Sequence, residues 1–453
     1  MTTPATAPQV DPRTIRLIKW RLLPFLMILY IAAFIDRGNI GFAADHLEAD
    51  LGITPAVFGL LSGAFFIGYF IFEVPSNMLL RKFGARKWIT RIVFSWGILA
   101  AATAFVDSAQ SLLIVRIVLG IAEAGFFPGI ILFLTYWFPE KERARTVALF
   151  MVALPVATVI AGPLSGFILD NVHWLGWASW RWMFLLEGLF AVALAPFVLK
   201  LLPDNPTKAK WLSDQQKDEL KARLDFEHHQ KVATHGEKSQ WKILINPRIL
   251  AMALIYFAKS TGIYALVFFT PSIMADLSQS SSATVVGLLT ALPYALATVF
   301  MIVWARRSDR TGERRKHVAG PYALGALALI ALGFYNTNVV VAIALICLIT
   351  VCMYIPYGPF WSLPSMFLTG AAAASGMAWI NALANLGGFF GPTILGTVKE
   401  NTGSVYPALF VVAALLLISS FTVMRLKVIT PIVGDAVKES ASSEAPAGHA
   451  QRG

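Results

Sequence analysis

The chain has 453 residues, of which 57% are hydrophobic and 14% are charged, whereas about 25% of the residues in an ordinary soluble domain are charged. This composition excludes a soluble globular protein, because so little charge cannot keep a surface of this size hydrated. The net charge of +11 would indicate a nucleic-acid partner in a soluble chain. Here the basic residues are spread over many loops, and we expect no nucleic-acid binding.

Lysine and arginine alternate between successive connections along the chain. Residues 44–56, 107–110, 170–180, 271–283 and 335–339 contain neither, whereas the N-terminus, the intervening connections and the tail are rich in both. This is the positive-inside pattern of a protein that crosses a lipid bilayer many times. We therefore predict a multi-pass membrane protein with cytoplasmic N- and C-termini.

In chain order, a cytoplasmic N-terminus (1–20) comes first, and the apolar run after it indicates a retained helix rather than a signal peptide. A spanning helix needs about 20 apolar residues. The candidates are 21–43, 57–79, 88–106, 111–136, 146–169, 182–202, 248–271, 284–304, 318–335, 339–360, 372–396 and 404–425. The fold class is thus an all-α membrane protein with twelve transmembrane helices in two six-helix halves, 21–202 and 248–427.

Residues 203–247 separate the two halves and are predicted to form a cytoplasmic linker, with a short surface helix at Asp214–Lys221. The tail, 428–453, is rich in Ala, Ser and Glu and is predicted to be disordered. No Cys or His spacing typical of a metal site occurs, and no Gly-Lys-Ser/Thr run indicates a nucleotide site. We expect no cofactor, and transport driven by an ion gradient.

A short basic motif occurs at matching places in the two halves. Residues 79–87 follow the second predicted helix and 308–316 follow the eighth, and each is a glycine turn flanked by cations. The positive-inside rule explains the charges. It does not explain the shared spacing around the glycine, which indicates an internal repeat.

The second copy, with Asp309 and Arg310, resembles the major facilitator superfamily signature between helices 8 and 9. The first copy has Arg81 where the signature has aspartate. The runs 36–43, 73–77 and 123–129, in this order, resemble the anion:cation symporter family, which includes bacterial permeases for tartrate, phthalate, hydroxyphenylacetate and hexonates. The resemblance implies the major facilitator fold and proton-coupled symport of an organic anion across the bacterial inner membrane. The sequence leaves the oligomeric state open, and a monomer suffices for this function.

Charged residues inside spanning helices are costly and are functional candidates by default. We propose from their positions that Arg37 binds a substrate carboxylate, because a guanidinium offers a bidentate fork. Glu123 would pair with Arg37 in the empty site, and on substrate arrival would be released and take up a proton. Asp36 would be a second proton site. The resemblance implies the same roles for the Asp-Arg pair and the helix 4 glutamate.

Structural readings stay open for these charges. Asp36 and Glu123 are alternatively buried partners of Arg37 and Arg116. Arg116 shares a helix face with Glu123, seven residues on, and alternatively holds helices 1 and 4 together.

Two further glutamates are interpreted as structural or gating charges. Glu73 lies beside Pro75 near the cytoplasmic end of helix 2. Glu187 follows Arg181 by six residues in helix 6 and is predicted to form a packing or gating ion pair with it.

Lys259 lies midway along the seventh predicted helix without an acidic residue within one turn. It either faces the cavity as a second cation, which suits a substrate with two carboxylates, or pairs with a carboxylate on another helix. The resemblance places Tyr69, Trp361 and Asn381 in the substrate cavity. Their alternatives are interface or packing roles for the aromatics and helix–helix hydrogen bonding for the amide, which has Asn385 one turn further on.

Phe34 and Leu154 occupy positions where the hexonate carriers of the family have polar groups, which favours a less hydroxylated acid, aromatic or short, such as phthalate or tartrate. A sugar-acid symporter and an exporter or exchanger of organic anions are the alternatives. A membrane enzyme or sensor is disfavoured, because no reactive His/Cys/Asp cluster lies in the spans and the linker is too short for an added domain.

Overall fold

The structure, a computed structural model, describes residues 8–233, 245–366 and 370–426, and these contain helices and no strands. The N-terminal half is formed by α1 (Pro12–Phe42), α2 (Ala44–Leu51), α3 (Pro55–Phe83), α4 (Ala85–Ala102), α5 (Ala109–Glu123), α6 (Phe126–Thr135), α7 (Glu140–Met151), α8 (Ala153–Asn171) and α9 (Ser179–Leu201). After α10 (Asp214–Ala233), the C-terminal half is formed by α12 (Pro247–Ser278), α13 (Ala283–Thr311), α14 (Arg315–Phe334), α15 (Val339–Tyr354), α16 (Tyr357–Ser362), α17 (Gly370–Asn385), α18 (Gly387–Thr402) and α19 (Tyr406–Arg425).

Among the described residues, 11 helical segments are long and apolar enough to cross a membrane. The predicted span 372–396 is broken into α17 and α18 at Leu386, so neither piece reaches that length alone. The break adjoins α12, where a Cβ on Gly387 would come within 2.6 Å of the Phe257 carbonyl oxygen. The close approach of two helix backbones therefore requires glycine at this position.

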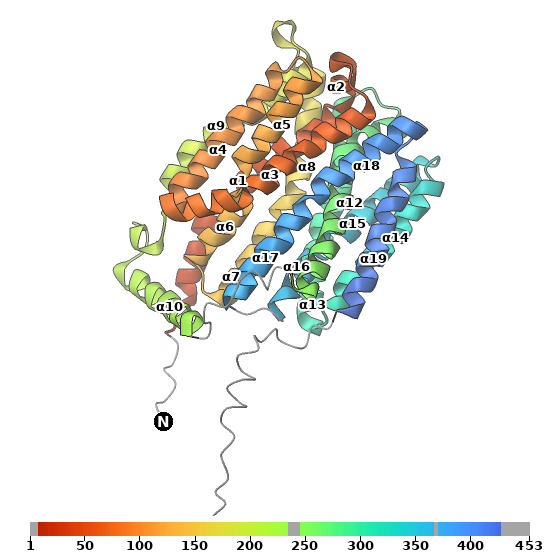
Figure 1. The fold of residues 1–453 in the computed structure, drawn as a ribbon. Coiled ribbons are helices and arrows are strands. Elements are labelled where there is room, and N and C mark those ends of the chain that lie inside the picture. Colours follow the sequence, from red (N-terminus) through yellow and green to blue (C-terminus); the bar gives the residue numbers. More distant parts are fainter. Residues whose placement is uncertain (1–7, 234–244, 367–369, 427–453) are drawn as a thin grey trace, which may run out of the picture.

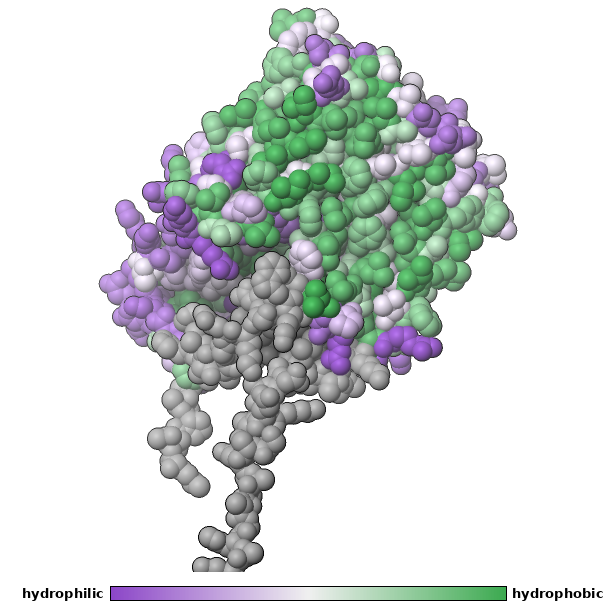
Figure 2. Space-filling model, viewed as in Figure 1, coloured by the Kyte–Doolittle hydropathy of each residue, from purple (hydrophilic) through white to green (hydrophobic). Residues whose placement is uncertain are grey.

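The helices lie side by side, and the start of α1 and the helix α10 lie at one end of the bundle (Figure 1). We call this end, where α1 begins and α9 and α19 finish, the terminal face, and the opposite end the distal face. Apolar side chains cover the middle of the visible side, and polar ones gather toward the ends (Figure 2). A bilayer would contact this apolar band.

The helix α10 of the predicted linker is attached to the N-terminal half. A Glu227 carboxylate oxygen accepts a hydrogen bond of 3.0 Å from the backbone N–H of Glu140, at the N-terminus of α7. The Trp211 ring, which precedes α10, stacks on Trp137 at 5.6 Å between centroids, and Leu220 is fully buried. Capping, stacking and burial together hold this segment on the terminal face.

At the distal face the two halves touch through small residues. The backbones of α8 and α13 cross at Gly162 and Gly287, and those of α3 and α18 at Gly59 and Pro392. A Cβ on any of these three glycines would overlap the facing backbone. Small residues at membrane helix crossings allow this close packing, which closes the distal face.

Two carboxylates fasten the same face by capping a helix of the opposite half. Asp170 of α8 accepts four hydrogen bonds at the start of α13: from the hydroxyls of Ser282 (2.7 Å) and Thr284 (2.6 Å) and the backbone N–H groups of Ala283 (2.8 Å) and Thr284 (2.8 Å). Glu400 of α18 accepts bonds from the Thr54 hydroxyl (2.6 Å) and the Ala56 N–H (3.0 Å) at the start of α3. Both satisfy helix N-termini that otherwise lack partners.

We predict that Asp170→Ala shifts the protein toward a conformation open at the distal face. Four hydrogen bonds, each contributing about 1 kcal/mol net, are lost, so we expect opening to rise by about tenfold or more. Ile263 lines a cavity between the two halves. A cysteine at this position, in a chain with Cys347 and Cys352 replaced by serine, reports opening through its rate of labelling by an impermeant maleimide. The matched control is Asp107→Ala, a distal carboxylate that accepts a hydrogen bond from Ser111 in the first turn of the adjoining α5 and makes no hydrogen bond to any described residue of the other half. Equal labelling in both variants would contradict the prediction.

Candidate functional site

A partly open cavity lies between the two halves, with about 440 Å³ of space free of protein atoms when the part that is open to solvent is included. Helices of both halves contribute to its wall. Its lining residues are Tyr30, Phe34, Arg37, Tyr69, Phe127, Met151, Leu154, Tyr256, Lys259, Ser260, Ile263, Tyr264, Tyr357, Asn381 and Asn385. The wall thus combines aromatic rings with two cations and two amides.

Arg37 of α1 and Glu123 of α5 form a buried ion pair at this wall. The Arg37 Nε donates to Glu123 Oε1 at 2.8 Å, and Nη2 lies 2.6 Å from the same oxygen. The guanidinium also packs against the rings of Phe34 and Tyr69, each with its centroid 5.0 Å away. The pairing predicted for the empty site is present, and the rings hold the guanidinium in place.

The local sequence explains how Glu123 reaches this position. Gly125 adopts a positive φ of 83° and separates α5 from α6, so Glu123 is the last residue of α5. A Cβ on Gly125 would lie 2.5 Å from the Ser76 hydroxyl of α3. Only glycine meets both demands, the left-handed backbone and the close neighbour.

Asp36 points to a different partner from its neighbour Arg37, as their separation of about 100° around the helix predicts. Asp36 Oδ2 accepts a bond of 2.7 Å from the Trp96 indole of α4, and the residue does not line the cavity. Its second oxygen, Oδ1, has no hydrogen-bond partner in the described part of the chain. Asp36 therefore lies behind the wall that Arg37 forms.

Arg116 is buried and donates from Nη2 to the carbonyl oxygen of Ser62 at 3.3 Å. This bond links α5 to α3, whereas the structural alternative from the sequence had Arg116 holding α5 to α1. The guanidinium also faces the Phe65 ring at 5.5 Å from its centroid.

The predicted ion pair between Arg181 and Glu187 is wrong. Glu187 accepts bonds from the Asn39 amide (2.9 Å) and the Ser165 hydroxyl (2.7 Å), and Arg181 donates to the Ala104 carbonyl at 2.7 Å. Six residues along a helix correspond to a rotation of about 240°, so the two side chains leave on different faces. Glu187 ties α9 to α1 and α8.

Lys259 of α12 lines the cavity, and its side chain makes no ion pair with any described residue. Its Nζ lies 3.3 Å from the Tyr357 ring centroid and 4.3 Å from that of Tyr256. Of the two alternatives from the sequence, this placement favours a cavity-facing cation over a paired one. Cation–π contacts supply part of the stabilisation that a carboxylate would give.

Glu73 of α3 is bonded to two amides of α17. The Asn381 amide donates to Glu73 Oε1 at 3.0 Å and the Asn385 amide to Oε2 at 3.4 Å. The amides are one helical turn apart and both line the cavity. This contact joins the two halves on the terminal side of the glycine crossings.

Of the three residues placed in the cavity by resemblance, Tyr69 and Asn381 line it and Trp361 does not. Trp361 packs behind it, with its ring 5.1 Å from Tyr256. Sequence reasoning missed the lining residues Tyr256, Ser260 and Tyr264. They follow one another at intervals of four residues along α12, next to Lys259, and this helical spacing was the available signal.

Comparison with known proteins decides the family, because the sequence profile of the Major Facilitator Superfamily matches residues 26–392. The chain belongs to the major facilitator superfamily. The "Putative tartrate transporter" of Agrobacterium vitis is 44% identical over 92% of each chain. The "Quinolone resistance transporter" of Acinetobacter baumannii is 40% identical over 89% of this chain and 92% of its own.

Among solved structures, this transporter resembles the xylose transporter XylE from E. coli in a partially occluded inward open conformation, with a TM-score of 0.72 at 15% identity over 90% of this chain and 98% of the other. At that identity the likeness concerns the fold. Fold and relatives alike are those of transporters, which are not enzymes.

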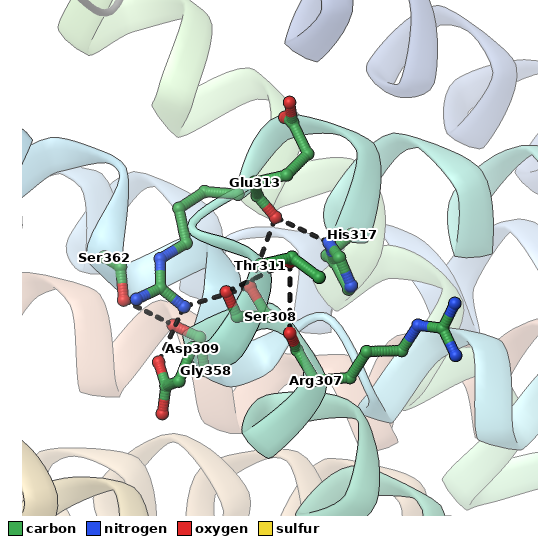
Figure 3. A network of polar contacts seen from close by, with 9 residues as sticks. Arg307, Ser308, Asp309, Thr311, Glu313, His317, Gly358 and Ser362 are labelled. Carbon is green, nitrogen blue, oxygen red and sulfur yellow. Dashed lines mark hydrogen bonds and ion pairs between the residues drawn. The ribbon is translucent and has the colours of Figure 1, made fainter.

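The superfamily signature of this transporter forms a glycine turn at the terminal face. Asp309 accepts a bond of 2.7 Å from Arg314, which also donates to the Ser308 hydroxyl at 3.0 Å. Figure 3 shows this turn, in which the Glu313 carbonyl oxygen accepts a hydrogen bond from the Ser308 hydroxyl and contacts the His317 ring. Arg310 is exposed. Gly312 in this copy and Gly84 in the first both have positive φ, 69° and 87°, so the repeat that the sequence predicted is a repeat of a glycine turn.

We predict that Arg37 and Glu123 of this transporter depend on each other for stability. Arg37→Met leaves the buried Glu123 carboxylate without its cation, and Glu123→Gln leaves the buried Arg37 guanidinium without its carboxylate. Each change should lower the free energy of unfolding by about 3 kcal/mol or more. The double variant avoids both unpaired charges. Its loss of melting temperature in detergent should therefore be smaller than the sum of the losses in the two single variants. Lys259→Met is the control for removing a cavity cation, and should destabilise less. Additive single and double effects would contradict the prediction.

Proposed function

We propose that the protein imports a small organic carboxylate together with protons, by alternating access across the inner membrane, with the terminal face in the cytoplasm. The observation that carries this proposal is the buried Arg37–Glu123 pair at the wall of a cavity between the two halves. An arginine in such a place recognises an anion, and its carboxylate partner is a site for the coupling proton.

Coupling follows from competition for one guanidinium. Arg37 already uses Nε and Nη2 toward Glu123. A substrate carboxylate that binds the same fork displaces Glu123, which is only about 1% exposed at its side chain and is costly to leave charged without a partner. Glu123 then takes a proton from water in the cavity, and both cargoes cross together. Asp36, with one oxygen unpartnered, is a second proton site in this proposal.

Alternating access fits the contacts between the halves. The glycine crossings and the caps of Asp170 and Glu400 close the distal face in this structure. Rocking of the two halves about the cavity would break these contacts and admit substrate from the distal side. Nothing in this cycle needs a second copy of the chain.

Lys259 supports a substrate with two carboxylates. It stands in the C-terminal half, whereas Arg37 stands in the N-terminal half, and both face the cavity. A dicarboxylate such as tartrate would bridge the two cations, which agrees with the name of the Agrobacterium relative. The tyrosine and phenylalanine rings of the wall also suit an aromatic dicarboxylate such as phthalate. A sugar acid is the alternative with less support, because Phe34 and Leu154 offer it no hydrogen bonds.

Export is a second candidate for direction, and the resistance transporter from Acinetobacter is the observation that favours it. Direction is set by the gradients, and coupling through Glu123 to an inward proton gradient gives import. Exchange without a proton gradient is the behaviour expected of a variant that lacks the proton site.

The proposal predicts that cells expressing the chain accumulate radiolabelled tartrate or phthalate, and that a protonophore abolishes accumulation. Glu123→Gln should still exchange the acid across the membrane without concentrating it, because the substrate site stays and the proton site is lost. Cells with empty vector are the baseline. If Glu123→Gln concentrates the acid as the wild type does, Glu123 is not the coupling residue.

The bridging role of Lys259 predicts a difference between dianions and monoanions. Lys259→Gln removes one charge-assisted hydrogen bond, of about 1.5 to 3 kcal/mol, and should raise the Kd for tartrate about tenfold or more. The Kd for the matching monoanion glycerate should change much less. Binding to purified protein by calorimetry measures both. Equal losses for the two acids would show that Lys259 does not read the second carboxylate.

A further inference from the structure

Four carboxylates are buried in the helices among the residues that the structure describes: Asp36, Glu73, Glu123 and Glu187. Three of them are bonded to side chains of their own half, to Trp96, to Arg37, and to Asn39 with Ser165. Glu73 alone is bonded across the interface, to the amides of α17. The hydrogen bonds of Glu73 therefore depend on how the two halves are placed relative to each other.

The surroundings of Glu73 compensate its charge poorly. The residue is 3% exposed, and its partners are two uncharged amides, one of them at 3.4 Å. No described lysine or arginine forms a salt bridge with it. The charged and titratable groups that face it are Arg37 of α1, Tyr69 of its own helix and Tyr256 of α12. Amide hydrogen bonds offset only part of the cost of burying a charge, so the balance is easily tipped.

A bound anion would tip this balance. Asn381 and Asn385 line the cavity, so an anionic oxygen that accepts a bond from either amide comes to lie beside Glu73. Two negative charges that share one amide in a water-poor site repel each other, and the weaker acid takes up a proton. Tyr69, one turn from Glu73, also lines the cavity and packs on the Arg37 guanidinium, so the site of anion binding and Glu73 adjoin.

We propose that Glu73 is a further coupling residue besides Glu123 and Asp36, and that it takes up a proton when an organic anion binds beside Asn381. The step is a proton transfer from cavity water to the carboxylate, and the proton leaves to the cytoplasm after the anion has gone. The neutral acid holds the two amides less strongly, which loosens α3 from α17 and helps the terminal face to open. This inference rests on the proposed proton-coupled import.

The test is the proton stoichiometry in proteoliposomes with tartrate and the membrane potential clamped at zero. With an imposed gradient of one pH unit, each coupled proton contributes about tenfold to the accumulation ratio at steady state. We expect Glu73→Gln to accumulate tartrate about tenfold less than the wild type. Glu187→Gln, which removes a buried amide-bonded carboxylate away from the cavity, is the matched control and should keep the wild-type ratio.

If Glu73→Gln reaches the same tartrate accumulation ratio as the wild type, the inference is overturned and the proposed function still stands. A wild type that fails to accumulate tartrate or phthalate under a pH gradient would overturn both.

A measurement on the unmodified chain covers the case in which the variant does not fold. A carbodiimide that reacts with protonated buried carboxyls should modify Glu73 more in the presence of tartrate, as read by peptide mass spectrometry. Glu187 provides the internal reference, whose modification should not change. Unchanged modification of Glu73 would overturn the inference.

Discussion

The burial of one arginine governs the architecture of this protein. The Arg37 guanidinium at mid-bundle has no water to hydrate it, so the surrounding helices have to compensate its charge, and here they do so with a carboxylate and aromatic rings. Glu123, Phe34 and Tyr69 meet that demand from α5, α1 and α3. Since the same guanidinium is the natural partner of an anion, the interaction that stabilises the empty cavity is also the one that substrate has to break.

The contacts between the halves divide by chemistry along the membrane normal. On the distal side they are glycine crossings and carboxylate-capped helix ends, which are close-packed and hydrogen-bonded. Nearer the terminal face, the described contact is between Glu73 and two amides. A packed interface opens as a unit, whereas a contact with an ionisable group also responds to charge. The two ends of the pathway are therefore suited to different triggers.

Much of the fold follows from the sequence, because hydropathy and the alternation of basic loops are properties of single segments. The division of the span 372–396 at Leu386 was not predicted, and neither was the close approach of α12 to Gly387. The pair Arg37–Glu123 was predictable from charge and depth. The partners of Glu187 were not, because Asn39 and Ser165 lie on helices whose rotation the sequence leaves open. Lys259 marked a cavity-facing side of α12, yet the tyrosines beside it were overlooked.

The docking of α10 determines where the chain can be divided into fragments. Glu227, Trp211 and Leu220 attach this helix to the N-terminal half, so the segment after residue 203 is, up to Ala233, a part of that half. A chain cut at the start of the predicted linker would strip Glu140 of its cap and Trp137 of its stacking partner. Complementary fragments for co-expression, or a fluorescent protein fused between the halves, therefore belong between Ala233 and Pro247, where the cap and the stacked rings stay intact.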